Sequence, residues 1–186
     1  LELHLNDDNY IVIFEHHDDV TVTSTDDSEY LITFYQIKSK KSGNWSVGDL
    51  LKTAPKTENT PTSILGKMFI KHFMFPECTI AVKFVSNMPL SLKGISNVEN
   101  DSEVCLENVD DKTKAKISEK LRLEFGTCIY GSACPSLYIS RGFFVRTSMS
   151  HNGSKEYAIG KINEFFASIK PTLTTGDIVA FYRTMY

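Results

Sequence analysis

The pattern of apolar and polar positions near the start of the chain predicts three β-strands. Residues 10–14 form a continuous apolar run, Tyr-Ile-Val-Ile-Phe, which is typical of a buried central strand. Residues 19–25 and 30–38 are apolar and β-branched runs with a period of two, and four polar residues, 26–29, separate them. We therefore expect a strand at 10–14 followed by an antiparallel hairpin.

The loop of this hairpin fixes which residues of its two strands face each other. With residues 26–29 as the loop, the facing pairs are Thr25 and Tyr30, Thr23 and Ile32, Thr21 and Phe34, and Asp19 and Gln36. Because side chains alternate between the two faces of a strand, Gln36 and Lys38 project to the same side as Asp19. The sequence thus predicts that a carboxylate, an amide and an ammonium group converge at the open end of the hairpin.

The rest of the chain alternates between helical and strand patterns. Helices are predicted from Ser46 to Leu51, from a cap at Thr62 or Ser63 up to Pro76, from Asp111 to Gly126, over residues 154–169 and from Thr174 onward. Strands are predicted over residues 78–85, with Ile80, Val82 and Phe84 on one face, and over residues 137–149, as one or two strands broken at Arg141-Gly142. Residues 86–110 are polar and irregular, and we expect an insertion there. This order predicts an α/β fold with a mixed central sheet flanked by helices.

The three polar groups of the hairpin suit the hydrolysis of a phosphodiester. Asp19 can hold a divalent cation, and Lys38 can orient or deprotonate a water aimed at phosphorus. Exposed Asp and Lys side chains are also common at strand ends, so this short pattern can arise without function. Trp45, just after the hairpin, either stacks on a base or packs the following helix against the sheet; packing is the more common use.

Charge is distributed unevenly along the chain, although the net charge is only −3. Residues 1–35 hold nine acids and no lysine or arginine, whereas residues 36–72 hold seven lysines and two acids. Such an arrangement fits a site that binds a cation and a polyanion together. Two solvated faces of opposite charge account for it equally well. Lys40 and Lys41, which follow the hairpin, are the candidate phosphate contacts.

Length and composition favour one ordinary globular domain. The 186 residues, 41% of them hydrophobic, are enough for one core, so we expect a single domain over residues 1–186. No run of apolar residues reaches the length of a membrane span, and no signal-peptide pattern is present, so we expect a cytoplasmic protein. The four cysteines lack the spacing of a zinc site and are expected to be idle thiols.

The pair formed by Asp19 and Gln36-Ile37-Lys38 resembles the signature of the PD-(D/E)XK nuclease superfamily, in which an acid begins one strand and (E/D/Q)-x-K ends the next. Further short segments also match in order. Together they resemble the endonuclease domain of bacterial anti-phage (CBASS) effectors associated with CD-NTases, and its relatives encoded beside NTPases. The matching segments are residues 15–20, 36–38, 45, 50–51, 63–67 and 84–87, so the resemblance runs over nearly the whole chain.

This resemblance implies a restriction-endonuclease-like fold and Mg²⁺-dependent cleavage of double-stranded DNA, with Mn²⁺ as a substitute metal. Asp19 and Gln36, with Glu15 as an auxiliary ligand, would hold the metal, and Lys38 would activate water. The family also implies a helix upstream of Leu1 that can supply another acidic ligand. Because Gln36 replaces an acid, the site has one negative charge fewer, which raises the need for Glu15, Asp18 or that helix.

The family further implies low sequence specificity, activation by assembly into a homo-oligomer, and a SAVED-type sensor domain or an NTPase as partner. Two alternatives come from other functional classes. The chain could be a non-catalytic oligomerisation module that docks on a HerA-type NTPase, in which case Lys38 has no role. It could also be a DNA-binding module of nuclease fold, which predicts salt-sensitive binding without cleavage.

Overall fold

The computed structural model describes residues 10–14, 19–24, 31–53, 62–92, 103–126 and 139–147, together with six single residues nearer the C-terminus. The chain divides into two compact units, Ile11–Ser148 and a second unit made of Leu1–Tyr10 and Met149–Tyr186. In the second unit Glu156, Ile159, Gly160, Glu164, Gly176 and Val179 are helical, within the stretches predicted as helices. The description that follows concerns the first unit and strand β1, which begins at its boundary.

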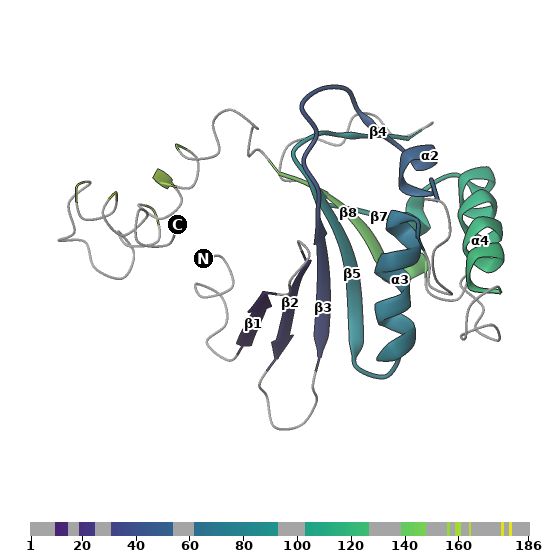
Figure 1. Cartoon of the computed structure of the whole chain (residues 1–186), viewed down its shortest axis with the longest axis horizontal. Helices are drawn as coiled ribbons and strands as arrows, with labels where there is room; N and C mark the ends of the chain where they lie inside the picture. Colours follow the sequence, from purple (N-terminus) through teal and green to yellow (C-terminus); the bar gives the residue numbers. More distant parts are fainter. Residues whose placement is uncertain are drawn as a thin grey trace. The chain divides into compact units, whose positions relative to one another are not determined.

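A six-stranded mixed sheet forms the centre of this unit (Figure 1). In spatial order it contains β1 (Tyr10–Phe14), β2 (Asp19–Ser24), β3 (Ile32–Ile37), β5 (Thr79–Ser86), β8 (Gly142–Arg146) and β7 (Glu103–Cys105). The pairs β2–β3 and β7–β8 are antiparallel, whereas β3–β5 and β5–β8 are parallel. The predicted α/β class with a mixed central sheet is therefore confirmed.

The predicted hairpin register is also confirmed. In the β2–β3 pair Asp19 lies opposite Gln36, Thr21 opposite Phe34 and Thr23 opposite Ile32. The predicted pairing of Thr25 with Tyr30 lies outside the described residues. Because a slip of one residue would move every side chain to the other face, this register decides which polar groups can meet at the hairpin end.

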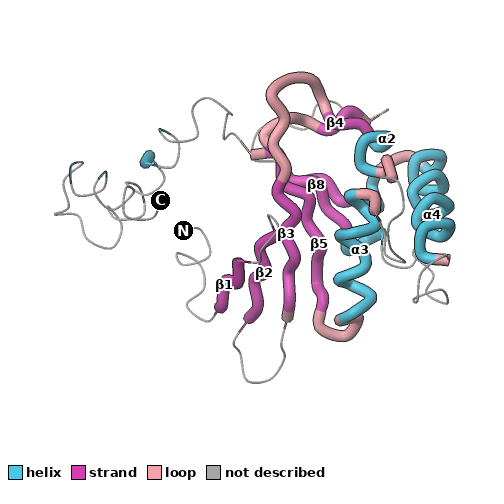
Figure 2. Tube along the Cα trace, viewed as in Figure 1, coloured by secondary structure: helices cyan, strands magenta, loops and turns pink. Residues whose placement is uncertain are grey.

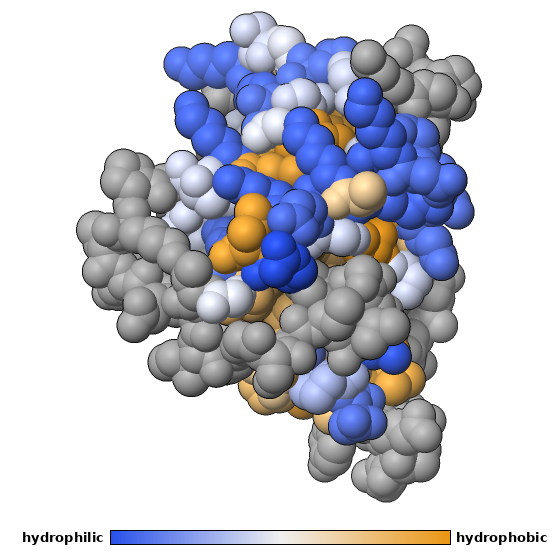
Figure 3. All heavy atoms as spheres, turned by 90° about the vertical axis from the view of Figure 1, so that its right-hand side faces the viewer, coloured by the Kyte–Doolittle hydropathy of each residue, from blue (hydrophilic) through white to orange (hydrophobic). Residues whose placement is uncertain are grey.

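Helix α3 (Ile64–Met74) packs on β3 and β5, and helix α4 (Asp111–Phe125) packs on α3 (Figure 2). Helix α3 begins at one of its two predicted caps, Ser63, whose hydroxyl accepts from Gly66 N at 2.8 Å. Helix α4 begins at Asp111, as predicted, and its cap is Asp110, which accepts from Thr113 N at 3.0 Å. The surface on the α4 side is mostly hydrophilic, with smaller apolar patches (Figure 3). None of the helices within the described stretches is long and apolar enough to cross a membrane.

Several short elements complete this unit. Helix α2 (Val47–Leu50) begins at the predicted cap, Ser46, which forms a capping box with Asp49. The strands β4 (Trp45–Ser46) and β6 (Leu90–Ser91) form a small parallel pair, and a 3₁₀ turn (Leu106–Asn108) links β7 to α4. Trp45 is buried, its indole N–H donates to Ser86 Oγ at 2.7 Å, and its ring meets that of Phe84 edge-on at 5.0 Å. Trp45 therefore packs into the core, which agrees with the packing alternative.

A buried glutamate joins α4 to the start of α3. Glu124 is 5% exposed, and its Oε1 accepts from the backbone N–H groups of Ser63 at 2.7 Å and Thr62 at 2.5 Å. Its Oε2 accepts from Ser63 Oγ at 2.5 Å. A carboxylate at a helix N-terminus satisfies free N–H groups and meets the positive end of the helix dipole. Glu124 thus fixes where α3 begins relative to α4.

Two predictions about the faces of strands are wrong. Residues 10–14 do form a strand, but β1 lies at the edge of the described sheet and its Phe14 is 80% exposed, so it is not a buried central strand. A continuous apolar run does not tell whether a strand has one neighbour or two. In β5, Val82 and Phe84 are buried but Ile80 is 49% exposed, because the β3–β5 register shifts at this point.

Two further predictions about the second half of this unit need correction. The stretch 86–110 is not wholly irregular: it contains β6, and β7 extends the edge of the main sheet. Residues 139–141 form a 3₁₀ turn and not a strand, and β8 begins at Gly142, where the break was predicted. A Cβ at Gly142 would lie 2.8 Å from the Phe69 ring and 2.9 Å from the Leu106 side chain, so the strand starts where only glycine allows the close approach of α3.

Candidate active site

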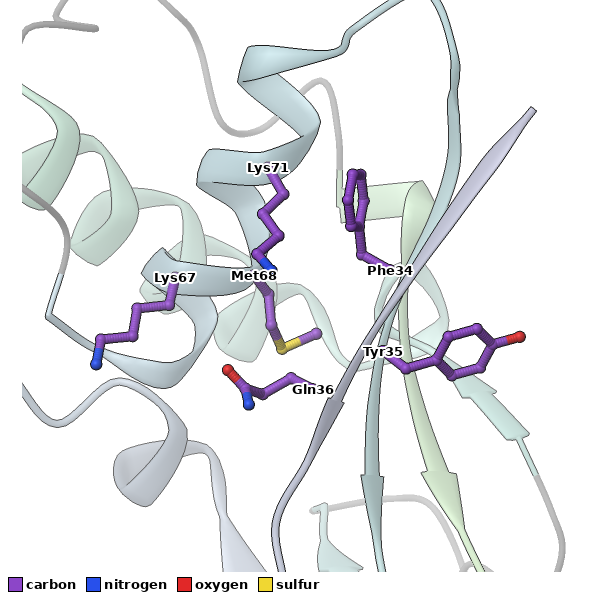
Figure 4. Close-up of a pocket in the computed structure, with 6 residues that line it drawn as sticks. All are labelled: Phe34, Tyr35, Gln36, Lys67, Met68 and Lys71. Atoms are coloured by element: carbon purple, nitrogen blue, oxygen red, sulfur yellow. The ribbon is translucent and has the colours of Figure 1, made fainter. Parts of the chain in front are cut away.

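Gln36 is the predicted site residue whose surroundings are described most fully. Its side chain is 8% exposed and extends from β3 toward α3, whereas Tyr35 extends to the opposite side of the sheet (Figure 4). It lines a small pocket together with Phe34, Tyr35, Lys67, Met68 and Lys71. Within the described residues the buried Nε2 of Gln36 has no hydrogen-bond partner. Leaving a buried amide donor unsatisfied costs about 1–3 kcal/mol, so an acceptor placed next to this Nε2 would be favourable.

Asp19 stands directly opposite Gln36, at the start of β2. Residues opposite each other in an antiparallel pair lie on the same face of the sheet. The side chains of Asp19 and Glu15 lie outside the described residues, so the metal ligand set of Asp19, Gln36 and Glu15 stays a prediction. Of the part of the chain that the structure describes, no group of three His, Cys, Asp or Glu residues could hold a metal ion. Cys78 and Cys105 are free thiols.

Lys38 follows directly after the last residue of β3. Its backbone N–H donates to Val85 O at 3.0 Å, so the parallel pairing with β5 continues one residue beyond Ile37. The alternation of side chains then places Lys38 on the same face as Gln36. The structure therefore keeps the three residues Asp19, Gln36 and Lys38 at one end of the hairpin, in the arrangement that the register predicts.

The available ligand chemistry fits a divalent cation. Mg²⁺ prefers oxygen ligands, binds few protein groups and keeps several waters. The position of Asp19 offers a carboxylate, and the carboxamide of Gln36 offers a neutral oxygen on the neighbouring strand. That these two residues hold a metal, with Glu15 as a third ligand, stays a prediction.

The loop after β3 is held to the end of β5. The side chain of Asn87 accepts from Lys40 N at 2.9 Å and donates to Lys40 O at 2.9 Å. The Lys40 ammonium donates to Asn44 O at 2.9 Å, contacts Asp49 Oδ2 at 3.3 Å and lies 4.6 Å from the centre of the Trp45 ring. Hydrogen bonds from the Ser46 backbone and hydroxyl, and then Lys40, lower the pKa of the Asp49 carboxyl.

These contacts make Lys40 part of the loop structure, while the neighbouring Lys41 is exposed. Whether either residue contacts DNA stays a prediction. Two other lysines near Gln36 were not singled out as site residues by the sequence: Lys67 and Lys71 lie four residues apart on α3 and line the same pocket. The sequence shows that these two lysines lie four residues apart on a predicted helix. It does not show that this helix packs on β3, which is what brings them near Gln36.

Comparison with known proteins shows which family this chain matches. The family described as the double-stranded DNA endonuclease domain of Cap4 matches residues 1–186, the whole chain. The similar solved structures include the Acinetobacter baumannii Cap4 SAVED/CARF-domain containing receptor with the cyclic trinucleotide 2'3'3'-cAAA, at 12% identity and a TM-score of 0.48, covering 94% of this chain and 34% of that one. The same receptor with 3'3'3'-cAAA gives 10% identity, a TM-score of 0.46, and coverage of 94% and 36%.

This chain thus spans about a third of the length of those receptors. No curated protein matches it. The match to the family covers every residue of the chain. This protein therefore belongs to the family of Cap4 double-stranded DNA endonuclease domains.

Proposed function

We propose that this chain cleaves double-stranded DNA with Asp19, Gln36 and Lys38 as its reactive group. The observation that carries the proposal is the β2–β3 register, which pairs Asp19 with Gln36 and leaves Lys38 two residues further along the same face. A family of endonuclease domains matches the whole chain, so a phosphodiester is the natural substrate of this group.

In this mechanism Asp19 and Gln36 would hold Mg²⁺, or Mn²⁺ in its place, and Glu15 would complete the ligand set. The bound metal supplies positive charge that stabilises the charge developing on the phosphate. Lys38 orients the attacking water by donating a hydrogen bond to its oxygen. The ladder bond from Lys38 N to Val85 O fixes the lysine backbone, so the ammonium is presented from a rigid strand end.

Regulation is the second part of the proposal. Residues 1–186 act as one nuclease domain that cleaves with low sequence specificity in the cytoplasm once copies of the chain assemble. The structurally similar receptors are described as SAVED/CARF-domain containing and as binding cyclic trinucleotides. A sensor unit of this kind, or an NTPase partner, would control assembly of this chain.

Plasmid cleavage tests the reactive group. The chain is incubated with plasmid at low and high protein concentration, with Mg²⁺ and with EDTA, as the wild type and as Asp19→Asn, Lys38→Met and Lys116→Met. Lys116 is an exposed lysine of α4 and serves as the control. We expect cleavage by the wild type and by Lys116→Met, and a loss of about a hundredfold or more in EDTA and in the two site variants.

Equal cleavage by Lys38→Met and the wild type would refute the assignment of Lys38. No cleavage at any protein concentration, together with salt-sensitive binding of duplex DNA, would instead favour the DNA-binding alternative. Loss of both activities would favour the oligomerisation module.

A further inference from the structure

The pocket beside Gln36 is rich in hydrogen-bond donors and positive charge. Within the described chain, the six residues that line it include Gln36, Lys67 and Lys71, and no Asp or Glu (Figure 4). The composition of this pocket suits an anion.

The two lysines are held on one side of α3. They are four residues apart, about one helical turn, so their side chains emerge from the same face. Lys67 is exposed, whereas Lys71 is half-buried with its ammonium 5.5 Å from the centre of the Phe34 ring. Phe34 precedes Gln36 by two residues on the same face of β3, so its ring keeps the Lys71 ammonium near the site.

Gln36 adds a donor that an acid could not provide. Its Nε2 is buried on the pocket side and has no hydrogen-bond partner within the described residues. A carboxamide carries both an acceptor oxygen and two N–H donors, whereas a carboxylate only accepts. One residue can therefore offer its oxygen to a metal and its N–H to a phosphate oxygen. With an acid at this position, the second oxygen would repel the phosphate.

We propose that Lys67, Lys71 and the Nε2–H of Gln36 bind a DNA phosphate at the mouth of this pocket. The three groups act as positioning residues: they hold the backbone of the duplex so that the bond to be cleaved lies over the hairpin end. This inference rests on the proposed function for the identity of the substrate, and it extends the site from the hairpin to helix α3. It also gives a reason for an amide at position 36, because the phosphate then meets no added negative charge.

Binding of a short fluorescent DNA duplex in EDTA tests this inference apart from cleavage. The dissociation constant is measured as a function of salt for the wild type, Lys67→Met, Lys71→Met and Lys116→Met. Methionine removes the ammonium but keeps a long apolar stem, so the packing of residue 71 on Phe34 is retained. We expect each α3 variant to bind about fivefold more weakly, with the slope of log K against log salt reduced by about 0.9, and Lys116→Met to match the wild type.

Lys71→Arg is the rescue variant, because it keeps the charge and should restore the salt slope. Lys67 is exposed, so Lys67→Met keeps the fold even if a change at residue 71 does not. Wild-type slopes in both methionine variants, or no duplex binding by the wild type, would overturn the inference even where cleavage still needs Asp19 and Lys38. If instead Asp19→Asn and Lys38→Met cleave like the wild type, the proposed function fails, while reduced slopes in the α3 variants still support phosphate binding at this pocket.

Discussion

Gln36 shows how one residue type can change the balance between two ligands. The superfamily signature that the hairpin resembles commonly has an acid at this position, and a carboxylate there attracts a metal ion but repels a phosphate. Compared with a carboxylate, the neutral amide of Gln36 has one negative charge fewer to attract a metal ion. The amide also has a buried N–H group, which lies next to two lysines of α3. Metal and DNA affinity should therefore respond in opposite directions to a single substitution.

The substitution Gln36→Glu tests whether metal affinity and DNA affinity change in opposite directions. We expect half-maximal cleavage at a lower Mg²⁺ concentration, because the added carboxylate strengthens metal binding. In EDTA we expect duplex DNA to bind about fivefold more weakly, because the new charge faces the phosphate site. Metal titration of plasmid cleavage and a binding titration provide the two measurements. Tighter DNA binding by the glutamate variant would show that the amide does not donate to the phosphate.

Helix α3 contributes to the site only if it starts at the right place, and that start depends on α4. Ser63 caps α3, and the same serine and its neighbour Thr62 donate three hydrogen bonds to Glu124. Two of the three donors are backbone N–H groups at a helix start, which have no partner within the helix. Glu124 is thus a second cap, supplied by another element, and the order of α3 on β3 depends on it.

Removal of this carboxylate should destabilise the protein. We expect Glu124→Ala to lower the free energy of unfolding by about 3 kcal/mol, since it leaves buried donors unsatisfied and opens a gap. Urea unfolding followed by circular dichroism provides the measurement. Glu119→Ala is the matched control on the same helix: Glu119 forms an exposed ion pair with Arg122, and its loss should change the free energy of unfolding much less than the loss of Glu124. Equal effects of the two variants would contradict the second-cap role.

At the scale of elements, local signals were predictable and long-range pairings were not. The caps at Ser46 and Ser63 follow from hydrogen bonds that span three residues, so the sequence contains them directly. The Asp19–Gln36 pairing followed because one short loop fixes the hairpin register. The edge position of β1 and the bulge that exposes Ile80 depend on which strands become neighbours, and no local pattern contains that information.

Residues 1–35 of the chain are acidic and residues 36–72 are basic, and the structure shows where several of these lysines lie. Lys40 from the basic stretch is bound within the loop after β3, whereas Lys67 and Lys71 line the pocket of Gln36. DNA contact by Lys40 and Lys41 stays a prediction, and the packing of α3 on β3 places Lys67 and Lys71 beside Gln36, which the sequence did not indicate. The resemblance to the endonuclease domain of CD-NTase-associated effectors is confirmed, since the Cap4 endonuclease family matches the whole chain.

The stability of the whole unit should fall in mild acid because of His72, which is 0% exposed on the inner side of α3. Burial, and then the positive charge of Arg141, lowers the pKa of His72 from 6.5 to about 4. Between these two values the unfolded chain binds a proton that the folded chain does not, so the folded state loses stability as the pH falls from about 6.5 to about 4. The loss due to this residue reaches about 3 kcal/mol, and above pH 6.5 it contributes none.

His72→Leu removes the titrating group and keeps an apolar side chain of similar size. We expect its free energy of unfolding, measured with urea at a series of pH values, to fall by about 3 kcal/mol less than that of the wild type between pH 7 and pH 4. Carboxylates titrate in the same range in both proteins, so the difference between the two curves isolates His72. Parallel curves would mean that the imidazole is protonated as readily in the folded state as in the unfolded one.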